Sequence, residues 1–161
     1  MSESLSECGK PVRFATLAEL RERVGQDLAI SDWVTITQER INLFAQATGD
    51  HQWIHVDPVR AAAGPFGTTI AHGFMTLSLL PELAEKALKI DDVVMGINYG
   101  LNKVRFPAPV PVDSRLRGHL RLLSWEPLDG GAQLVMQITI EREGSDKPVC
   151  VAEAVSRRFT G

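Results

Sequence analysis

The sequence predicts an α+β fold in which a curved antiparallel sheet wraps around one long central helix. Two observations lead to this prediction. The second half of the 161 residues alternates between apolar and polar positions, and residues 73–88 are apolar on most faces of a helix. A strand with one dry face needs a cover, and a helix that is apolar on most faces needs to be buried. Packing the helix against the sheet satisfies both needs.

The strands of the second half are separated by clear turn signals. Asp-Gly-Gly at 129–131 predicts a hairpin, and the glycine and proline within 144–148 predict a second turn. Period-two alternation is clearest in the two segments that flank the hairpin. The predicted strands are residues 93–106, 114–122, 133–141 and 149–159.

Residues 37–48 form the clearest amphipathic helix of the first half. Ile41, Phe44 and Ala45 recur on one face, and Thr35 or Thr37 can cap the N-terminus. Gly49 is well placed to end this helix in a left-handed turn. Asp50 is therefore expected just beyond a helix end, on a loop that is fixed on one side.

The remaining elements are shorter. Pro81 lies inside the predicted central helix and should bend it, because proline removes a backbone hydrogen bond. Asp57 is expected to cap a single helical turn. The other segments are a loose tail at 1–12, a helical stretch at 14–24, a short strand at 29–36, the helical turn at 59–63 and a loop at 64–67.

Composition and charge exclude several classes of protein. The chain is 44% hydrophobic and 23% charged with a formal net charge of -3, so nucleic acid is not expected as a partner. No apolar run is long enough to span a bilayer, and the polar N-terminus is not a secretory signal. Cys8 and Cys150 are too isolated for a disulfide framework or a zinc site. We expect a reduced, cytoplasmic protein without a metal, in which Cys150 is a core residue.

Asp50, His55 and Gly73 are the candidate catalytic groups. A carboxylate and an imidazole five residues apart can hold one water between them, and a glycine N–H at a helix start can stabilise an oxyanion. These are the parts needed to add water to an activated double bond, or to remove it. Asp50 is assigned as the base and His55 as its partner, while the group that protonates the α-carbon stays open.

Each of these residues also has an ordinary structural role available to it. Asp50 can be a solvated residue at a helix end, and His55 a surface or capping histidine. His72 is expected to be a core or supporting histidine that places Gly73. Trp53 can wall an acyl pocket or pack the loop. Surface roles are expected for His51 and His119, and either a solvated strand face or coenzyme A phosphate contacts for Arg105, Arg115, Arg117 and Arg121.

Three motifs, in this order, resemble those of the MaoC-like dehydratases. This family includes the (R)-specific 2-enoyl-CoA hydratases, and the motifs are most similar to its nodulation protein N branch. The motifs are Ala-Thr-Gly-Asp-x-x-x-x-His-x-Asp-Pro at 47–58, Ile-Ala-His-Gly at 70–73, and Val-Arg-Phe-Pro-Ala-Pro-Val at 104–110. The resemblance covers residues 30–159. It implies a single hot-dog domain over 1–161, a homodimer joined at sheet edges, and reversible hydration of trans-2-enoyl-CoA to (R)-3-hydroxyacyl-CoA.

The resemblance also implies roles for individual residues. Asp50 and His55 take the positions of the family's acid/base pair, and Gly73 that of its oxyanion donor. No cofactor is implied, because coenzyme A enters only as part of the acyl-CoA substrate. Substrate contacts are expected from Gln52, Trp53, His72 and Ser78.

Two departures from the family pattern bear on activity. The commoner motif is Asp-x-Asn-Pro-x-His, and Gln52 and Trp53 stand here in place of the asparagine and proline. Some relatives carry a serine where this chain has Pro81, and Ser78 lies one turn away. A hot-dog thioesterase and a non-catalytic acyl-CoA or acyl-carrier binding protein are therefore alternative functions. Acyl chain length, the choice between coenzyme A and a carrier protein, and dimer versus higher oligomer stay open.

Overall fold

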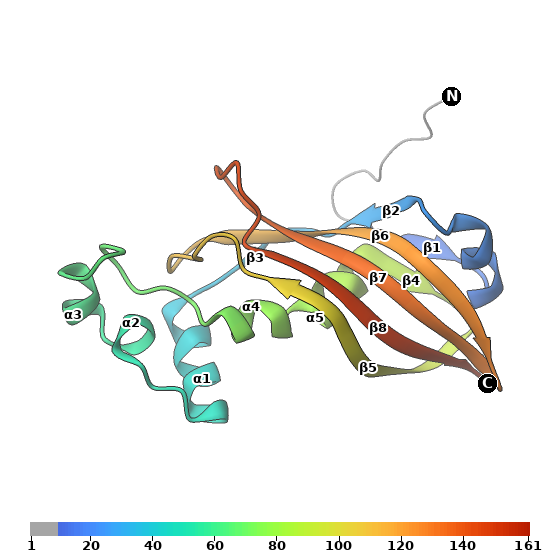
Figure 1. The fold of residues 1–161 in the computed structure, drawn as a ribbon, viewed down its shortest axis with the longest axis horizontal. Coiled ribbons are helices and arrows are strands. Elements are labelled where there is room, and N and C mark those ends of the chain that lie inside the picture. Colours follow the sequence, from blue (N-terminus) through green and yellow to red (C-terminus); the bar gives the residue numbers. More distant parts are fainter. Residues whose placement is uncertain (1–9) are drawn as a thin grey trace.

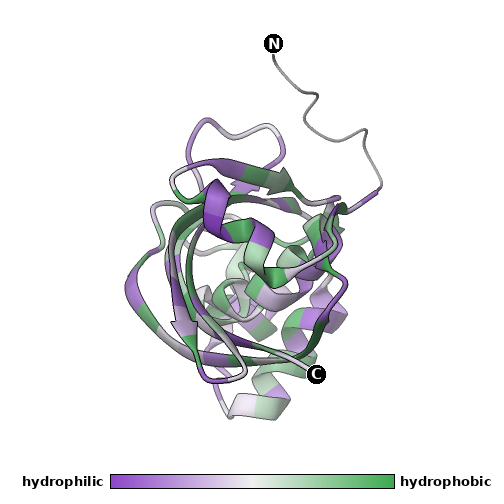
Figure 2. Cartoon of the chain, turned by 90° about the vertical axis from the view of Figure 1, so that its right-hand side faces the viewer, coloured by the Kyte–Doolittle hydropathy of each residue, from purple (hydrophilic) through white to green (hydrophobic). Residues whose placement is uncertain are grey.

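A curved antiparallel sheet dominates the computed structural model, which describes residues 10–161 (Figure 1). Its strand order is β2-β6-β7-β8-β5, and β3 also pairs with β6. Viewed end-on, the sheet curves around the central helical segment (Figure 2). The sheet strands are β2 (Asp27–Ile30), β3 (Val34–Thr35), β5 (Val93–Arg105), β6 (Arg115–Leu128), β7 (Gly131–Arg142) and β8 (Cys150–Thr160).

The period-two prediction for the second half is confirmed. In β7 every second residue is buried, and the β6–β7 hairpin turns at Asp129 and Gly130, where Gly130 has a positive φ of 75°. β6 continues beyond the predicted end at residue 122. A register shift between Leu122 and Ser124 interrupts its alternation, which explains why the sequence pattern fades there.

The central helix is broken into two pieces, α4 (Gly73–Ser78) and α5 (Leu80–Ala87). Leu79 separates them, and Pro81 occupies the first turn of α5, where its missing N–H costs little. The predicted bend is therefore confirmed as a break just before the proline. Leu88 leaves the helix and begins β4 (Leu88–Ile90), so the predicted helix end was one residue too late.

The helical segment lies against the concave face of the sheet (Figure 1). Leu83 of α5 is fully buried, and its side chain lies so close to Gly118 of β6 that a Cβ there would meet it at 3.2 Å. Glycine at this position lets helix and sheet approach each other closely. The prediction of burial on most helix faces was wrong for one face, because Phe74 is 69% exposed.

The N-terminal part differs from the prediction in three places. Val12 belongs to a strand, β1 (Val12–Phe14), which pairs in parallel with β4, so the predicted tail ends too late, and residues 1–9 lie outside the described part. The helical stretch is a 3₁₀ helix, η1 (Leu17–Arg23), whose buried Leu17 and Leu20 share one side because that helix repeats every three residues. The strand at 29–36 is divided between β2 and β3.

Three short helices precede the central segment: α1 (Gln38–Thr48), α2 (Trp53–Val56) and α3 (Pro58–Ala62). The caps of α1 are as predicted, since the Thr37 side chain accepts from the Arg40 N–H and Gly49 has a φ of 81°. Asp57 caps α3 by accepting from the N–H of Arg60. α2 was not predicted from the sequence, and it is only four residues long.

One hydrophobic core joins the sheet, the central helical segment and η1. Cys150 is a fully buried part of this core, and burial raises the pKa of its thiol to about 11. Within residues 10–161 no helix is long and apolar enough to cross a bilayer.

Candidate active site

Asp50 is positioned by the end of α1. The Gly49 N–H donates to the Ala45 carbonyl at 2.8 Å, and the left-handed glycine turns the chain sharply after the helix. Asp50 follows at once and is exposed. Its Oδ1 accepts from the Gln52 backbone N–H at 3.3 Å, which leaves the other carboxylate oxygen available to bind water.

His55 lies on α2, which is tied to two other segments. The Gln38 side chain donates to the His55 carbonyl at 2.8 Å, and the Ile70 N–H donates to the Ile54 carbonyl at 3.0 Å. These bonds anchor a helix that is too short to be stable alone.

The His55 ring is buried and has a defined tautomer. Its Nδ1 lies 2.7 Å from the Ile70 carbonyl, which can only accept, so Nδ1 carries the proton and Nε2 presents a lone pair. Burial is the largest cause that lowers the pKa of His55 below 6.5, and the charge of His72 adds to it. The Ile70 hydrogen bond and Asp50 oppose the shift. The net effect favours the neutral imidazole that a proton acceptor needs.

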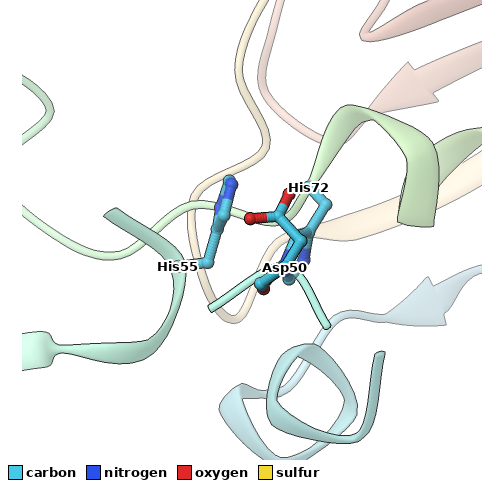
Figure 3. A group of neighbouring side chains, drawn as sticks. All are labelled: Asp50, His55 and His72. Carbon is cyan, nitrogen blue, oxygen red and sulfur yellow. The ribbon is translucent and has the colours of Figure 1, made fainter. Parts of the chain in front are cut away.

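His72 contacts both of the other two residues. Its Nε2 is 2.9 Å from the Asp50 backbone carbonyl, and its ring stacks on His55 with centroids 3.9 Å apart. Phe44 packs against the same ring at 4.9 Å. Figure 3 shows the Asp50 carboxylate and the two imidazoles gathered from three separate segments, with one carboxylate oxygen turned toward His55.

Gly73 opens α4 directly after His72, so its N–H has no partner within the helix. It lines a cavity of about 300 Å³ together with His55, and this volume is at the small end of the range for ligand sites. The rest of the wall is largely apolar. It is formed by Phe66, Ile70, Ala71, Thr76, Val149 and residues 106–110.

The cavity wall shows which predicted residues come together. His55 and Gly73 share it, and Asp50 and His72 lie beside His55. The 106–110 wall was not predicted as part of the site, although it falls within the third motif of the resemblance. That motif was the signal in the sequence that could have identified it.

The four residues predicted to contact substrate, among them the buried His72, do not line this cavity in the single chain. Gln52 is exposed, its backbone N–H donates to Asp50 Oδ1 and its carbonyl accepts from the His55 N–H at 3.0 Å. Trp53 packs beside Gly64 and under the Arg60 guanidinium, 4.5 Å from its ring centroid. The exposed Ser78 hydroxyl donates to the Phe74 carbonyl at 2.7 Å, a bond within its own helix.

The four arginines considered for coenzyme A phosphate contacts all have partners within the chain. Arg115 pairs with Glu143, Arg117 with Glu141 and Arg121 with Asp27 on the sheet surface, which favours the solvated-face interpretation over phosphate binding. The remaining arginine of that group, Arg105, donates to the Val104 carbonyl. His119, expected to be exposed on the polar strand face, is half-buried there and lies 2.6 Å from Glu141.

Asp50, His55 and His72 have the composition of a metal site, with one possible ligand atom from each within 4.8 Å of the others. An imidazole binds a metal along an in-plane lone pair. The two rings, however, are stacked with only 26° between their planes. A shared ion would have to lie in the planes of both rings. Because the two ring planes are nearly parallel, they intersect far beyond metal–nitrogen bonding distance, so the two rings as arranged cannot share one ion. The trio is better suited to holding water.

The fold and site place the chain among the hot-dog hydro-lyases. An R-hydratase of Pseudomonas aeruginosa in the unliganded form superimposes with a TM-score of 0.70 at 25% identity, covering 91% of this chain and 87% of that one. An (R)-hydratase of A. caviae superimposes with a TM-score of 0.66 over 83% of this chain and 94% of its own, and at 23% identity it supports the fold alone.

The family follows from the sequence comparisons. Residues 19–156 match the MaoC like domain, and the chain belongs to this family of dehydratases. The chain is 61% identical over 145 residues to 3-hydroxyacyl-thioester dehydratase Z of Mycobacterium tuberculosis H37Rv, covering 89% of this chain and 96% of that protein. It is 46% identical to nodulation protein N of Rhizobium leguminosarum, covering 88% and 89%. The resemblance and the predicted hot-dog fold are thereby confirmed.

Proposed function

We propose that this protein catalyses the reversible hydration of trans-2-enoyl-CoA to (R)-3-hydroxyacyl-CoA. The observation that carries the proposal is the gathering of Asp50 and the neutral His55 beside an apolar cavity that Gly73 also lines. The same reaction run backwards is the dehydration of a 3-hydroxyacyl thioester. That is the reaction named for the relative with 61% identity.

The geometry supports a separate role for each of Asp50, His55 and Gly73 in the reaction. A water can donate one hydrogen to the Asp50 carboxylate and the other to His55 Nε2, which turns its oxygen lone pair toward the β-carbon of the substrate. Asp50 takes the water proton as the carbon–oxygen bond forms. The thioester oxygen then becomes negative, and the Gly73 N–H stabilises it. A proton from the Asp50–His55 pair finally reaches the α-carbon, which restores both groups.

This scheme needs neither a metal nor a cofactor, since all proton transfers occur between water, the pair and the substrate. The cavity wall accepts an acyl chain because it is mainly apolar. Its modest volume favours short acyl chains in the single chain. Coenzyme A is therefore needed only as the carrier of the substrate, and we place the protein in the reduced cytoplasm, where the buried free thiol of Cys150 is safe from oxidation.

We also propose that two copies pair through β5. This strand lies at one edge of the sheet. Several of its large apolar side chains are exposed, among them Val94, Met95, Ile97 and Leu101. Exposed apolar edge strands of this length are normally covered by another element, because their unpaired backbone N–H and C=O groups can hydrogen-bond to a further strand. A second β5 provides such a cover.

The function is tested by supplying purified protein with crotonyl-CoA and longer trans-2-enoyl-CoAs. We expect loss of the enoyl absorbance, fastest for short chains, and formation of the (R)-3-hydroxy product in chiral analysis. A thiol reagent in a parallel sample distinguishes a thioesterase, which would release free coenzyme A. No loss of enoyl absorbance with any chain length, or an (S) product, would refute the proposal.

A further inference from the structure

We propose that His72 is a positioning residue that fixes Asp50 and His55 in their working geometry, an inference that rests on the proposed hydratase function. His72 contacts both members of the pair and directly precedes Gly73. One side chain thus connects the base, its partner and the start of the oxyanion helix. Neither a catalytic contact with substrate nor a metal is required of it.

The first contact holds the Asp50 backbone. Asp50 is exposed and follows a left-handed glycine, so its loop has few packing contacts of its own. The His72 Nε2–H donates to the Asp50 carbonyl at 2.9 Å, across 22 residues of chain. This bond fixes the peptide from which the carboxylate extends, while the Gln52 N–H fixes one carboxylate oxygen.

The second contact holds the His55 ring. The Ile70 carbonyl fixes His55 at one edge through Nδ1, and the stacked His72 ring fixes it across one face. Phe44 supports His72 in turn, with ring centroids 4.9 Å apart. An edge contact and a face contact together leave the His55 ring little freedom to rotate, which directs its Nε2 lone pair.

Packing alone does not account for a histidine at this position. The side chain of His72 is almost completely buried, at 2% exposure, and its Nδ1 has no partner within the described residues. A phenylalanine would fill the same space without an unpaired nitrogen, and an unpaired buried nitrogen is unfavourable. The Nε2 donor to the Asp50 carbonyl is a contact that an apolar side chain cannot supply.

Two substitutions separate the contributions of the ring and the donor. His72→Phe keeps a ring against His55 and Phe44 but loses the donor to Asp50. His72→Gln keeps an N–H donor at similar reach but loses the stacked ring and its charge. The neighbouring His51→Gln is the matched control, since His51 is exposed and lies in the same loop.

We expect kcat for enoyl-CoA hydration to fall by about 10- to 100-fold in His72→Phe with KM nearly unchanged, because the pair is displaced while the cavity remains. His72→Gln should retain more of kcat than His72→Phe. In His72→Gln the pKa of His55, followed by NMR, should rise, because the charge of His72 that lowers this pKa is removed. His51→Gln should match wild type in both readouts.

Wild-type kcat in a folded His72→Phe, or a loss confined to KM, would overturn the proposal. If His72→Phe does not fold, an unchanged His55 pKa in His72→Gln would overturn it instead. The NMR titration needs no turnover. A wild type that is inactive on every enoyl-CoA therefore refutes the proposed function, whereas a His55 that does not respond to His72→Gln refutes this inference.

Discussion

His55 is the residue whose ionisation should control activity at low pH. Its burial, at 6% exposure, lowers its pKa from 6.5, and the hydrogen bond from Nδ1 to Ile70 selects the tautomer with a free Nε2. Only this neutral form can accept a hydrogen bond from the attacking water. The environment therefore extends the active form to a lower pH than an exposed histidine would allow.

We accordingly expect kcat/KM to decline at low pH with a midpoint below 6.5. The measurement is a pH profile of crotonyl-CoA hydration in wild type. A decline with its midpoint above 6.5 would contradict the assignment of His55. The same shift has a consequence for stability: its contribution is fully present above pH 6.5 and is lost as the pH falls through the lower folded-state pKa.

At this scale the sequence predicted the central residues but not their support. Asp50, His55 and Gly73 could be proposed because they lie in short motifs with a chemical meaning. The stack between His55 and His72 could not, because it depends on how the loop after α3 returns to α4. Gln52, Trp53 and Ser78 were proposed from motif position, and in the single chain each contacts its own local segment instead.

The break in the central helix is the main feature at the level of elements. α4 is only six residues long, and it places Gly73 at the cavity while α5 fills the core behind it. The 106–110 segment forms an adjoining part of the cavity wall, with Phe106 lying against Gly73. The oxyanion site therefore depends on a close approach between a helix start and the segment that follows β5.

Gly73→Ala should reduce kcat by about tenfold, because a Cβ at this position would meet the Phe106 ring at 3.1 Å. The ring or the helix start must move by a few tenths of an ångström, which misplaces the N–H donor. Adding Phe106→Leu should restore part of the rate in a double-mutant cycle, with Phe106→Leu alone as the control. Strictly additive losses would show that the contact is not responsible.

Elements with strong periodicity were predictable, and elements defined by tertiary contacts were not. The strands β5, β7 and β8 and the helix α1 began and ended within one or two residues of the prediction. The bulge in β6, the interruption between β2 and β3 and the four-residue α2 have no periodic pattern to reveal them. Ser31, for example, lies at the strand interruption, where its hydroxyl accepts from the buried Gly118 N–H at 2.8 Å.

At the level of the whole molecule, the exposed β5 edge predicts a dimer. Leu101 lies within this strand and is 45% exposed, whereas Leu43 of α1 is 57% exposed at a distance from the edge. Leu101→Lys should shift the protein from two chains toward one in light scattering, because a charge disfavours edge pairing. Leu43→Lys should leave the mass unchanged. A wild type that runs as a single chain, or equal dissociation by both variants, would refute β5 pairing.

The central claim is that Asp50 and His55 add water to an enoyl thioester, and comparing wild type with Asp50→Asn tests it most directly. Asparagine keeps the shape of the side chain but cannot take a proton. The measurement is the initial rate of crotonyl-CoA hydration, with thermal unfolding followed on the same samples. We predict that the wild type is active and that the rate is at least ~100-fold lower in Asp50→Asn, with unchanged thermal unfolding. An equal rate in the two proteins would contradict it.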